Sequence, residues 1–340
     1  MPDERIYPLT FEPQLRDYIW GGRNLERLYG RRLPPGPVAE SWEVSAHPEA
    51  PTRVLHGHWQ GCTLPEVHAA LGPALVEERA LGDFCGGRFP LLVKLLDAEQ
   101  DLSVQVHPDD DYACQHEQGD TGKVECWYIL HARPSVELIY GLAPGVDREG
   151  FVRAIHEGRV PETLARLPVR AGDCVFVPAG TLHAITAGTV LVEIQQNSDA
   201  TYRVYDWDRV GHDGRPRALH IEQALDVINW AGGAPGVVQP QLLGEGDGVR
   251  RARLVACPQF HLEQLDLAAG AVYQGACTSE TFEVWGCLQG EVELAWAGAP
   301  LHLASIGFAL LPAALGRFEL RAQGPARLLR AFLGVGDQRR

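Results

Sequence analysis

The sequence predicts a mainly β protein made of two jelly-roll β-barrel domains with a few helices, the second barrel being a degenerate copy of the first. Three observations lead to this prediction. The 340 residues are too many for most single hydrophobic cores and enough for two modest ones. Short apolar segments recur between turns rich in Gly, Pro and Asp, as in antiparallel sandwiches and barrels. The last third of the chain also repeats, faintly, the pattern of the segments before it.

Three stretches carry helical periodicity. The first, 63–82, opens with Thr63 and has Glu66 three residues later, which is the arrangement of a capping box. The other two cover 148–166 and about 219–230. The remaining apolar segments are short and bounded by turns, so we expect strands there. These segments are 89–98, 102–108, 123–130, 136–142, 173–180, 189–196 and 201–207, followed by 260–267, 281–296, 308–315 and 326–333.

Gly and Pro are concentrated in residues 231–241 (AGGAPGVVQPQ), a composition typical of a linker. We therefore expect a first domain at residues 1–230, which contains the helical segments, and a second at residues 242–340. The first domain should hold the chemistry, because the polar clusters described below all fall within it.

Short sequence echoes support the repeat. The tripeptide VEL at 136–138 recurs at 292–294. The segment GDCVFVPAGTLH, which ends at His183, resembles GFALLPAALGR, which ends at Arg317. If the two segments are equivalent, an arginine stands near the place of His183, and the second copy lacks the polar cluster of the first.

The charge and composition of the chain limit the kinds of molecule that it is expected to bind. Acidic residues outnumber basic ones by 44 to 30, and the formal net charge is −14. A chain of this charge is a poor ligand for nucleic acid or an anionic membrane. The start of the chain, MPDERIYPLTF, has no apolar core of a secretory signal, and no run of about 18 apolar residues occurs. We expect a cytoplasmic protein, a monomer or weak homodimer, with a small-molecule partner and neither a nucleic-acid nor a membrane partner.

Four polar residues have the spacing of a metal site. Gln105 and His107 are two apart in a predicted strand, so their side chains leave the same face. Glu125 opens the next strand, and His183 follows a Pro/Gly turn. Two imidazoles, a carboxylate and an amide oxygen suit a divalent ion such as zinc. The alternative is that His107 only ends a strand before an acidic turn and that His183 only caps a loop.

Basic residues gather around these positions. Only two of the 30 basic residues are lysines, Lys94 and Lys123, and Lys123 shares a strand face with Glu125. Arg203 and Arg209 share a face if the strand through 201–207 stays regular. Cations beside a metal in an acidic protein indicate an anionic ligand such as phosphate. An ordinary surface role remains open for Arg203, because 28 arginines are present, and is less well supported for Lys123.

Through most of residues 6–230 the sequence resembles the type I mannose-6-phosphate isomerases (phosphomannose isomerases), in particular their short bacterial form. The order and spacing of the matching motifs are highly specific, whereas the C-terminal third matches only loosely. The matching segments are DYIWGG, ESWEVS, FPLLVKLLDA, LSVQVHPDD, GKVECWYIL, VPAGTLHAI and EIQQNSDATYRVYDWDR.

The resemblance implies a zinc-dependent enzyme with two cupin domains that interconverts mannose 6-phosphate and fructose 6-phosphate through a cis-enediol. It implies one zinc ion per chain, with Gln105 a weaker or absent ligand in the short form. It also implies that Arg203 is the active-site arginine, and that Arg209 stands where relatives can have lysine. The implied zinc ligands are Gln105, His107, Glu125 and His183, and the implied pocket residues are Ser103, Lys94, Lys123 and Arg209.

The proton moved between C1 and C2 needs a base, and Lys123 is our first hypothesis, because zinc and the arginines would lower its pKa. A water bound by the metal is the rival, and Arg203 would stabilise the enediolate. Two other classes stay open: another metal-dependent cupin enzyme such as an iron oxygenase, and a non-catalytic cupin that binds sugar phosphate or regulates carbohydrate metabolism.

Overall fold

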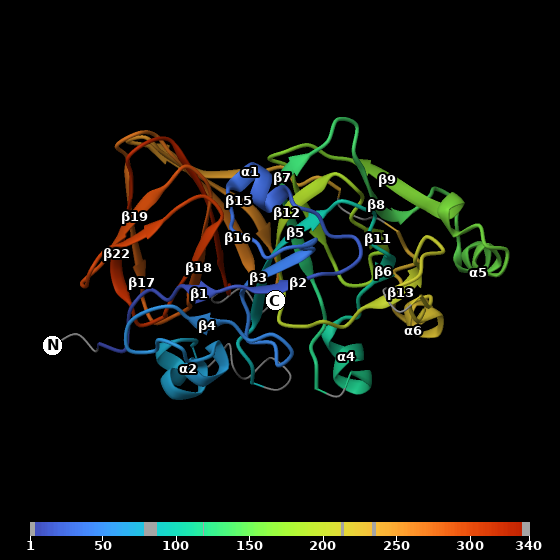
Figure 1. Ribbon diagram of the computed structural model, residues 1–340, viewed down its shortest axis with the longest axis horizontal. Coiled ribbons are helices and arrows are strands. Elements are labelled where there is room, and N and C mark those ends of the chain that lie inside the picture. The colour runs from blue at the N-terminus through green and yellow to red at the C-terminus, as the bar shows by residue number, and fades with distance from the viewer. Residues whose placement is uncertain (1–3, 78–86, 118, 212–213, 233–235, 335–340) are drawn as a thin grey trace. The chain divides into compact units, whose positions relative to one another are not determined.

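The computed structural model describes residues 4–77, 87–117, 119–211, 214–232 and 236–334 (Figure 1). In these ranges the chain forms many short strands and few helices, so the predicted mainly β class is confirmed. None of the helices in the described ranges is long and apolar enough to cross a membrane.

The chain divides into two compact units. The middle unit consists of residues 15–41 and 93–238, and the C-terminal unit consists of residues 1–14, 42–92 and 239–340. Two N-terminal segments, residues 1–14 and 42–92, therefore group with the C-terminal third. A single division at the linker 231–241 would place both segments in the first domain. The predicted domain limits stay a prediction, and the units are described separately below.

The middle unit contains two sheets, of order β10-β7-β12-β5-β3-β2 and β13-β6-β11-β8-β9. In the first sheet β7 is antiparallel to both β10 and β12, and all the pairs of the second sheet are antiparallel. Their strands are β2 (Gln14–Arg16), β3 (Glu40–Val44), β5 (Leu91–Ala98), β6 (Val104–Val106), β7 (Glu125–Ala132), β8 (Glu137–Leu142), β9 (Leu164–Pro168), β10 (Cys174–Val177), β11 (His183–Ala184), β12 (Thr189–Gln196) and β13 (Tyr202–Tyr205). The helices are α1 (Asn24–Tyr29), α4 (Asp110–His116), α5 (Arg148–His156), the 3₁₀ turn η2 (Val160–Thr163) and α6 (Ile221–Val227).

Alternating side chains give this unit two apolar layers. Trp127 of β7 and Leu138 of β8 belong to a cluster between the two sheets. Ile139 points the other way and packs with Phe151 of α5 and Ala224 of α6. Helices α5 and α6 thus cover the outer face of the β13-β6-β11-β8-β9 sheet, and Figure 1 shows both at that end of the unit.

All three predicted helices are shorter than expected, and the one predicted near 219–230 is α6. Within 148–166 the helix ends at His156, because Gly158 adopts a left-handed conformation with φ of 69°, and the chain continues through η2 into strand β9. The predicted helix 63–82 is α2 (Leu64–Leu71), and its capping box between Thr63 and Glu66 is confirmed. Residues 78–82 of that prediction lie outside the described ranges.

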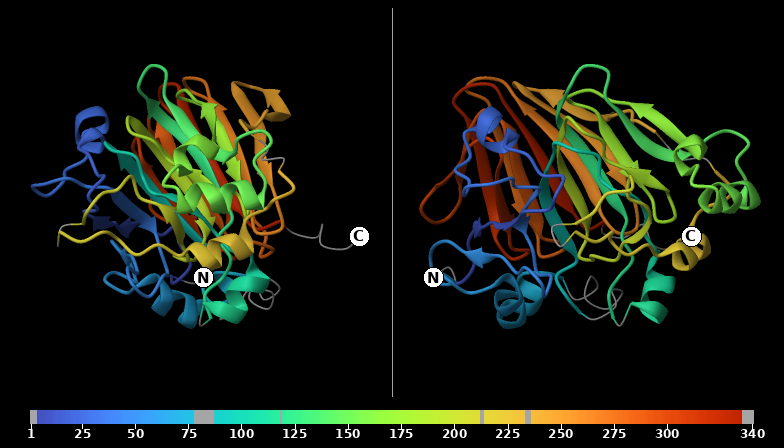
Figure 2. Two further views of the ribbon diagram at one scale, coloured as in Figure 1. Left: turned by 90° about the vertical axis from the view of Figure 1, so that its right-hand side faces the viewer. Right: turned by 45° about the vertical axis from the view of Figure 1, so that its right-hand side comes forward.

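The C-terminal unit contains two antiparallel sheets, of order β14-β15-β16-β23-β18-β21 and β17-β22-β19-β20. Figure 2 shows their strands in orange and red. Their strands are β14 (Gln241–Gly246), β15 (Val249–Ala256), β16 (His261–Leu267), β17 (Val272–Cys277), β18 (Glu283–Gln289), β19 (Val292–Ala295), β20 (Leu301–Leu303), β21 (Gly307–Leu311), β22 (Gly316–Ala322) and β23 (Ala326–Phe332). The unit further contains β1 (Phe11–Glu12), β4 (Arg53–Val54), α2 and the 3₁₀ turn η1 (Gly72–Ala74).

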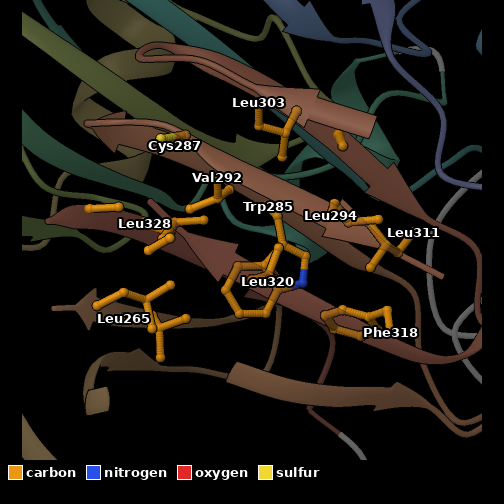
Figure 3. Close-up of a cluster of buried hydrophobic side chains, with 14 of the residues drawn as sticks. Leu265, Trp285, Cys287, Val292, Leu294, Leu303, Leu311, Phe318, Leu320 and Leu328 are labelled. Carbon is orange, nitrogen blue, oxygen red and sulfur yellow. The ribbon is translucent and has the colours of Figure 1, made fainter. Parts of the chain in front are cut away.

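The core of this unit is apolar. Trp285 lies at its centre, surrounded by Leu265, Phe318, Leu320 and Leu328 from both sheets (Figure 3). Large side chains from the two inner faces fill the space between the sheets.

The predicted internal repeat is confirmed by topology. The order β10-β7-β12-β5 of the middle unit is reproduced as β21-β18-β23-β16, and β6-β11-β8-β9 is reproduced as β17-β22-β19-β20. In this alignment β22, which begins at Gly316, takes the place of β11, so Arg317 falls near the place of His183. Arg317 is exposed, and it is the next residue, Phe318, that packs edge-on against Trp285 as His183 packs against Trp127. The second barrel is therefore degenerate in the predicted sense: His107, Glu125 and His183 form the metal-binding group found in the described part of the chain.

The second barrel has nevertheless kept buried charge. Glu283 opens β18 as Glu125 opens β7, and each is paired with the last residue of the neighbouring strand. Arg330 of β23 donates to Glu283, and its Nη1 lies 3.1 Å from Glu263 Oε2. An arginine is thus the counter-charge of a carboxylate that stands at the place of a predicted metal ligand.

We expect Arg330→Met to lower the free energy of unfolding by about 3–5 kcal/mol, because it leaves the buried carboxylate of Glu283 without its counter-charge and, within the described ranges, that of Glu263 with Arg251 alone. Arg327→Met is the matched control on the same strand: Arg327 pairs with Asp266, and both side chains are partly exposed, so its loss should cost about 1 kcal/mol or less. Urea unfolding of the two variants measures the difference. Equal losses would show that Arg330 contributes only as a surface ion pair does.

Candidate metal centre

Three polar side chains from three strands meet inside the middle unit. His107 directly follows β6, Glu125 opens β7 and His183 opens β11. One ligand atom from each of the three lies within 4.8 Å of the others, and all three residues are buried. The pairing of the strands explains the meeting, because His183 lies directly opposite Gln105. The predicted convergence of these three residues is confirmed.

Both imidazole rings are held by the backbone. His107 Nδ1–H donates to the carbonyl oxygen of Ala200 at 2.8 Å, and His183 Nδ1–H donates to that of Thr181 at 2.9 Å. These bonds leave a lone pair on each Nε2, which lies 3.2 Å (His107) or 3.6 Å (His183) from a carboxylate oxygen of Glu125. A hydrogen bond to the far ring nitrogen is the usual means of orienting a histidine ligand.

Three inward-facing atoms of this group have no hydrogen-bond partner among the described residues. Within the described residues, His107 Nε2 and both carboxylate oxygens of Glu125 are buried and make no hydrogen bond. Such atoms are costly to bury unless something else binds them. A divalent cation with a preference for nitrogen and oxygen ligands would bind all of them, so the donor set fits zinc and leaves coordination positions for a substrate.

The electrostatics favour the protonation states of metal ligands. Burial and then the nearby His107 lower the pKa of His183 to about 3, and burial and then Lys123 lower the pKa of His107. Burial alone would raise the pKa of Glu125, but the positive charge of Lys123 and the His107 ring hold it well below its usual range. The group thus presents two neutral imidazoles and a carboxylate.

Lys123 lies at the edge of this group, with its Nζ 3.0 Å from Glu125 Oε1. Burial is the largest influence and lowers the pKa of Lys123, but the negative charges of Glu125, Glu193 and Asp199 together outweigh it, so the net direction is upward. The cation that opposes this rise is Lys94 rather than an arginine. Beside a charged Glu125, Lys123 is therefore an ammonium, and no arginine is among the main influences on its pKa.

Lys94 is fully enclosed between two acids that sequence reasoning missed. Its Nζ lies 3.6 Å from Glu40 Oε2 and 3.5 Å from Glu193 Oε1, and Glu193 also accepts a hydrogen bond from Trp127 Nε1 at 3.0 Å. The Trp127 ring packs edge-on against that of His183, with centroids 5.2 Å apart. The rarity of lysine in this sequence was the feature that could have indicated these acids. A lysine within a strongly apolar strand is expected to be buried, and a buried lysine requires acidic partners.

Gln105, Ser103 and Arg203 form a chain of contacts beside the histidines. Gln105 Nε2 lies 3.5 Å from His183 Nε2, and Gln105 Oε1 accepts a hydrogen bond from Ser103 Oγ at 3.3 Å. Arg203, opposite Gln105 in the sheet, donates through Nε to Ser103 Oγ at 3.2 Å. The amide oxygen of Gln105 is thus engaged by Ser103, and its role as a fourth ligand stays a prediction.

The predicted shared face of Arg203 and Arg209 is wrong. Strand β13 ends at Tyr205, and Trp207 and Asp208 have φ values of 57° and 53°, so the alternation breaks before Arg209. Arg209 instead turns back, and its Nη2 donates to Asp206 Oδ1 at 2.7 Å.

Comparison with known proteins identifies the family to which this chain belongs. Residues 9–125 match the family model described as "Phosphomannose isomerase type I, catalytic domain". The mannose-6-phosphate isomerase of Streptococcus mutans is 41% identical over 268 residues, covering 78% of this chain and 81% of the relative. Mannose-6-phosphate isomerase ManA of Bacillus subtilis is 35% identical over 315 residues, covering 92% and 95%. The chain belongs to the type I phosphomannose isomerase family.

The solved structures agree with this membership. The crystal structure of the mannose 6-phosphate isomerase from Bacillus subtilis superposes with a TM-score of 0.85 at 33% identity, covering 95% of this chain and 99% of that one. A zinc-bound mannose 6-phosphate isomerase structure shares the fold, with a TM-score of 0.77 at 18% identity and coverage of 96% and 100%. The two barrels are thus the cupin domains of a phosphomannose isomerase.

We expect His183→Ala to lower the affinity for zinc by more than about 100-fold, because loss of a ligand should exceed the roughly 10–100-fold cost of losing an outer hydrogen-bond partner. Elemental analysis of the purified, dialysed protein measures the bound metal. His116→Ala, at the exposed end of α4, is the control and should keep the wild-type content. Full retention of zinc by His183→Ala would remove His183 from the ligand set.

Proposed function

We propose that this chain is a zinc-dependent mannose-6-phosphate isomerase that interconverts mannose 6-phosphate and fructose 6-phosphate through a cis-enediol. The observation that carries the proposal is the buried group of His107, Glu125 and His183 beside the buried cation Lys123. Among the residues that the structure describes, His107 Nε2 and both carboxylate oxygens of Glu125 make no hydrogen bond. The names of the relatives support the same activity, since those of Streptococcus mutans and Bacillus subtilis are called mannose-6-phosphate isomerases.

Aldose–ketose isomerisation requires that a C–H bond beside a carbonyl become acidic. A zinc ion held by His107, Glu125 and His183 would supply positive charge for the developing negative charge on a substrate oxygen. The protein holds its ligands rigidly through the backbone carbonyl groups of Ala200 and Thr181, so little reorganisation accompanies the reaction.

Lys123 is our candidate for the proton shuttle between C1 and C2. Its amine is buried at the rim of the ligand group, and Lys94 adds a second positive charge nearby. Because Glu125 now stabilises the ammonium form, the role of Lys123 as a base requires that the charge of Glu125 be taken up by the metal. Arg203, fixed by Ser103 and by the carbonyl group of Ala218, would steady the substrate or stabilise the enediolate.

Two further properties belong to the same proposal. A phosphorylated sugar carries charge that an apolar bilayer excludes, so we place the enzyme with its substrate in the cytoplasm. The predicted state, a monomer or weak homodimer, stays a prediction, as does the fourth ligand Gln105. A non-catalytic sugar-phosphate-binding cupin, such as a regulator of carbohydrate metabolism, is the alternative function and would bind the same ligand without turnover.

A coupled assay for fructose 6-phosphate formed from mannose 6-phosphate tests the proposal. We expect activity in the purified protein, its loss on treatment with a chelator, and its return when zinc is added, because the ligand group is incomplete without its cation. Wild-type zinc content without any turnover would contradict the proposal and would favour the non-catalytic alternative.

Lys123→Ala should lower kcat by at least about 100-fold, the usual scale for loss of a general base. Zinc content should stay at the wild-type level, as elemental analysis would show. Lys123→Arg is the informative companion, because arginine keeps the charge beside Glu125 but cannot release its proton. If Lys123→Arg restores kcat, the lysine acts through its charge; an unchanged kcat in Lys123→Ala would exclude it from the reaction.

A further inference from the structure

A cluster of arginines lies around one buried carboxylate, that of Asp206. Arg217 donates to both of its oxygens, through Nε to Oδ2 at 2.7 Å and through Nη2 to Oδ1 at 2.5 Å. Arg209 donates to Oδ1 through Nη2 at 2.7 Å. Sequence reasoning did not single out Arg217, since it lies beyond the strand that carries Arg203.

This cluster is joined to the candidate metal centre through Arg203. Arg203 Nη1 donates to the carbonyl oxygen of Ala218, the residue next to Arg217, at 2.9 Å. Arg203 also lies opposite Gln105 in the sheet and donates to Ser103 Oγ. Arg217 is therefore one residue along the chain from a direct contact of the active-site arginine.

The cluster carries more positive than negative charge. Burial lowers the pKa of Arg203, the positive charges of Arg217 and Arg209 lower it further, and Asp206 only partly opposes them. Asp101 gives Arg209 its backbone carbonyl oxygen, while its own carboxylate accepts from the N–H of Ala187. In a chain of net charge −14, a half-buried surplus of positive charge is the local exception that an anionic ligand requires.

The three guanidinium groups differ in what they can still bind. All three nitrogens of Arg209 already donate to Asp206 or Asp101. Within the described part of the chain, Arg217 Nη1 has no acceptor, and a quarter of its side chain is exposed. Arg217 thus has a nitrogen without an acceptor and an open approach, whereas every nitrogen of Arg209 already makes a hydrogen bond and Arg209 helps to hold Asp206 and, through it, Arg217.

We propose that Arg217 binds the phosphate group of the substrate and so determines specificity for the phosphorylated sugar, with Arg209 and Asp206 as positioning residues. The identity of the sugar phosphate rests on the proposed function, whereas the anion site rests on the cluster itself. A guanidinium held on one side by a carboxylate presents its remaining N–H groups in a fixed direction, which suits a phosphate oxygen.

The first test is kinetic. Arg217→Ala should raise KM for mannose 6-phosphate by about 10- to 100-fold, as expected for loss of a charge-assisted hydrogen bond, and change kcat by no more than about threefold. Zinc content should stay at the wild-type level. Arg217→Lys should recover part of the loss, because it restores a point charge without the planar fork. Arg215→Ala, an exposed neighbour, is the matched control and should keep the wild-type KM.

The second test needs no turnover. Calorimetric titration of the zinc-loaded protein with inorganic phosphate should show binding that weakens by a similar factor in Arg217→Ala and not in Arg215→Ala. If Arg217→Ala does not fold, Arg217→Gln replaces it, because glutamine keeps an N–H for Asp206 and removes the charge. Wild-type phosphate affinity and KM in the Arg217 variant would overturn the inference. Arg217-dependent phosphate binding in a protein without isomerase activity would instead overturn only the proposed function.

Discussion

The charge of Glu125 is the constraint on which the rest of the candidate site depends. A carboxylate buried between two sheets must be compensated, and Lys123 supplies only one contact to it, at 3.0 Å. The two histidines face it with lone pairs rather than protons, because backbone carbonyl groups take their Nδ1–H groups. The other buried charges near the site are compensated in the same way. Lys94 has two acidic partners, and Asp206 has two arginine partners.

Most of this site could be predicted from sequence because its information is local. The alternation of side chains in β6 predicts that Gln105 and His107 share one face. The short turn before His183 predicts a strand start there, and in the structure this strand pairs with Gln105. Glu125 opens β7, which lies in the other sheet of the unit, so its approach to the histidines depends on the packing of the two sheets. The partners Glu193 and Asp206 could not be predicted, because nothing in the sequence near a lysine or an arginine states which distant acid will face it.

Other failures have equally physical causes. The alternation argument for Arg209 assumed a regular strand, and two residues with positive φ at Trp207 and Asp208 redirect the chain. The helix predicted to run to residue 166 stops ten residues early, because the left-handed Gly158 follows it. Residues 42–92 group with the C-terminal third through long-range packing. Local periodicity in the sequence carries no information on such packing.

The pair formed by Arg330 and Glu283 shows what became of the second barrel. The buried carboxylate of Glu283 is compensated by a side chain of the same barrel, that of Arg330. This barrel therefore needs no ion from solution to compensate Glu283. The barrel that contains Glu125 must obtain part of its counter-charge from the surrounding solution. Two barrels with the same strand order thus differ in their dependence on the environment: one is charge-compensated by its own side chains, and the other depends on the supply of metal.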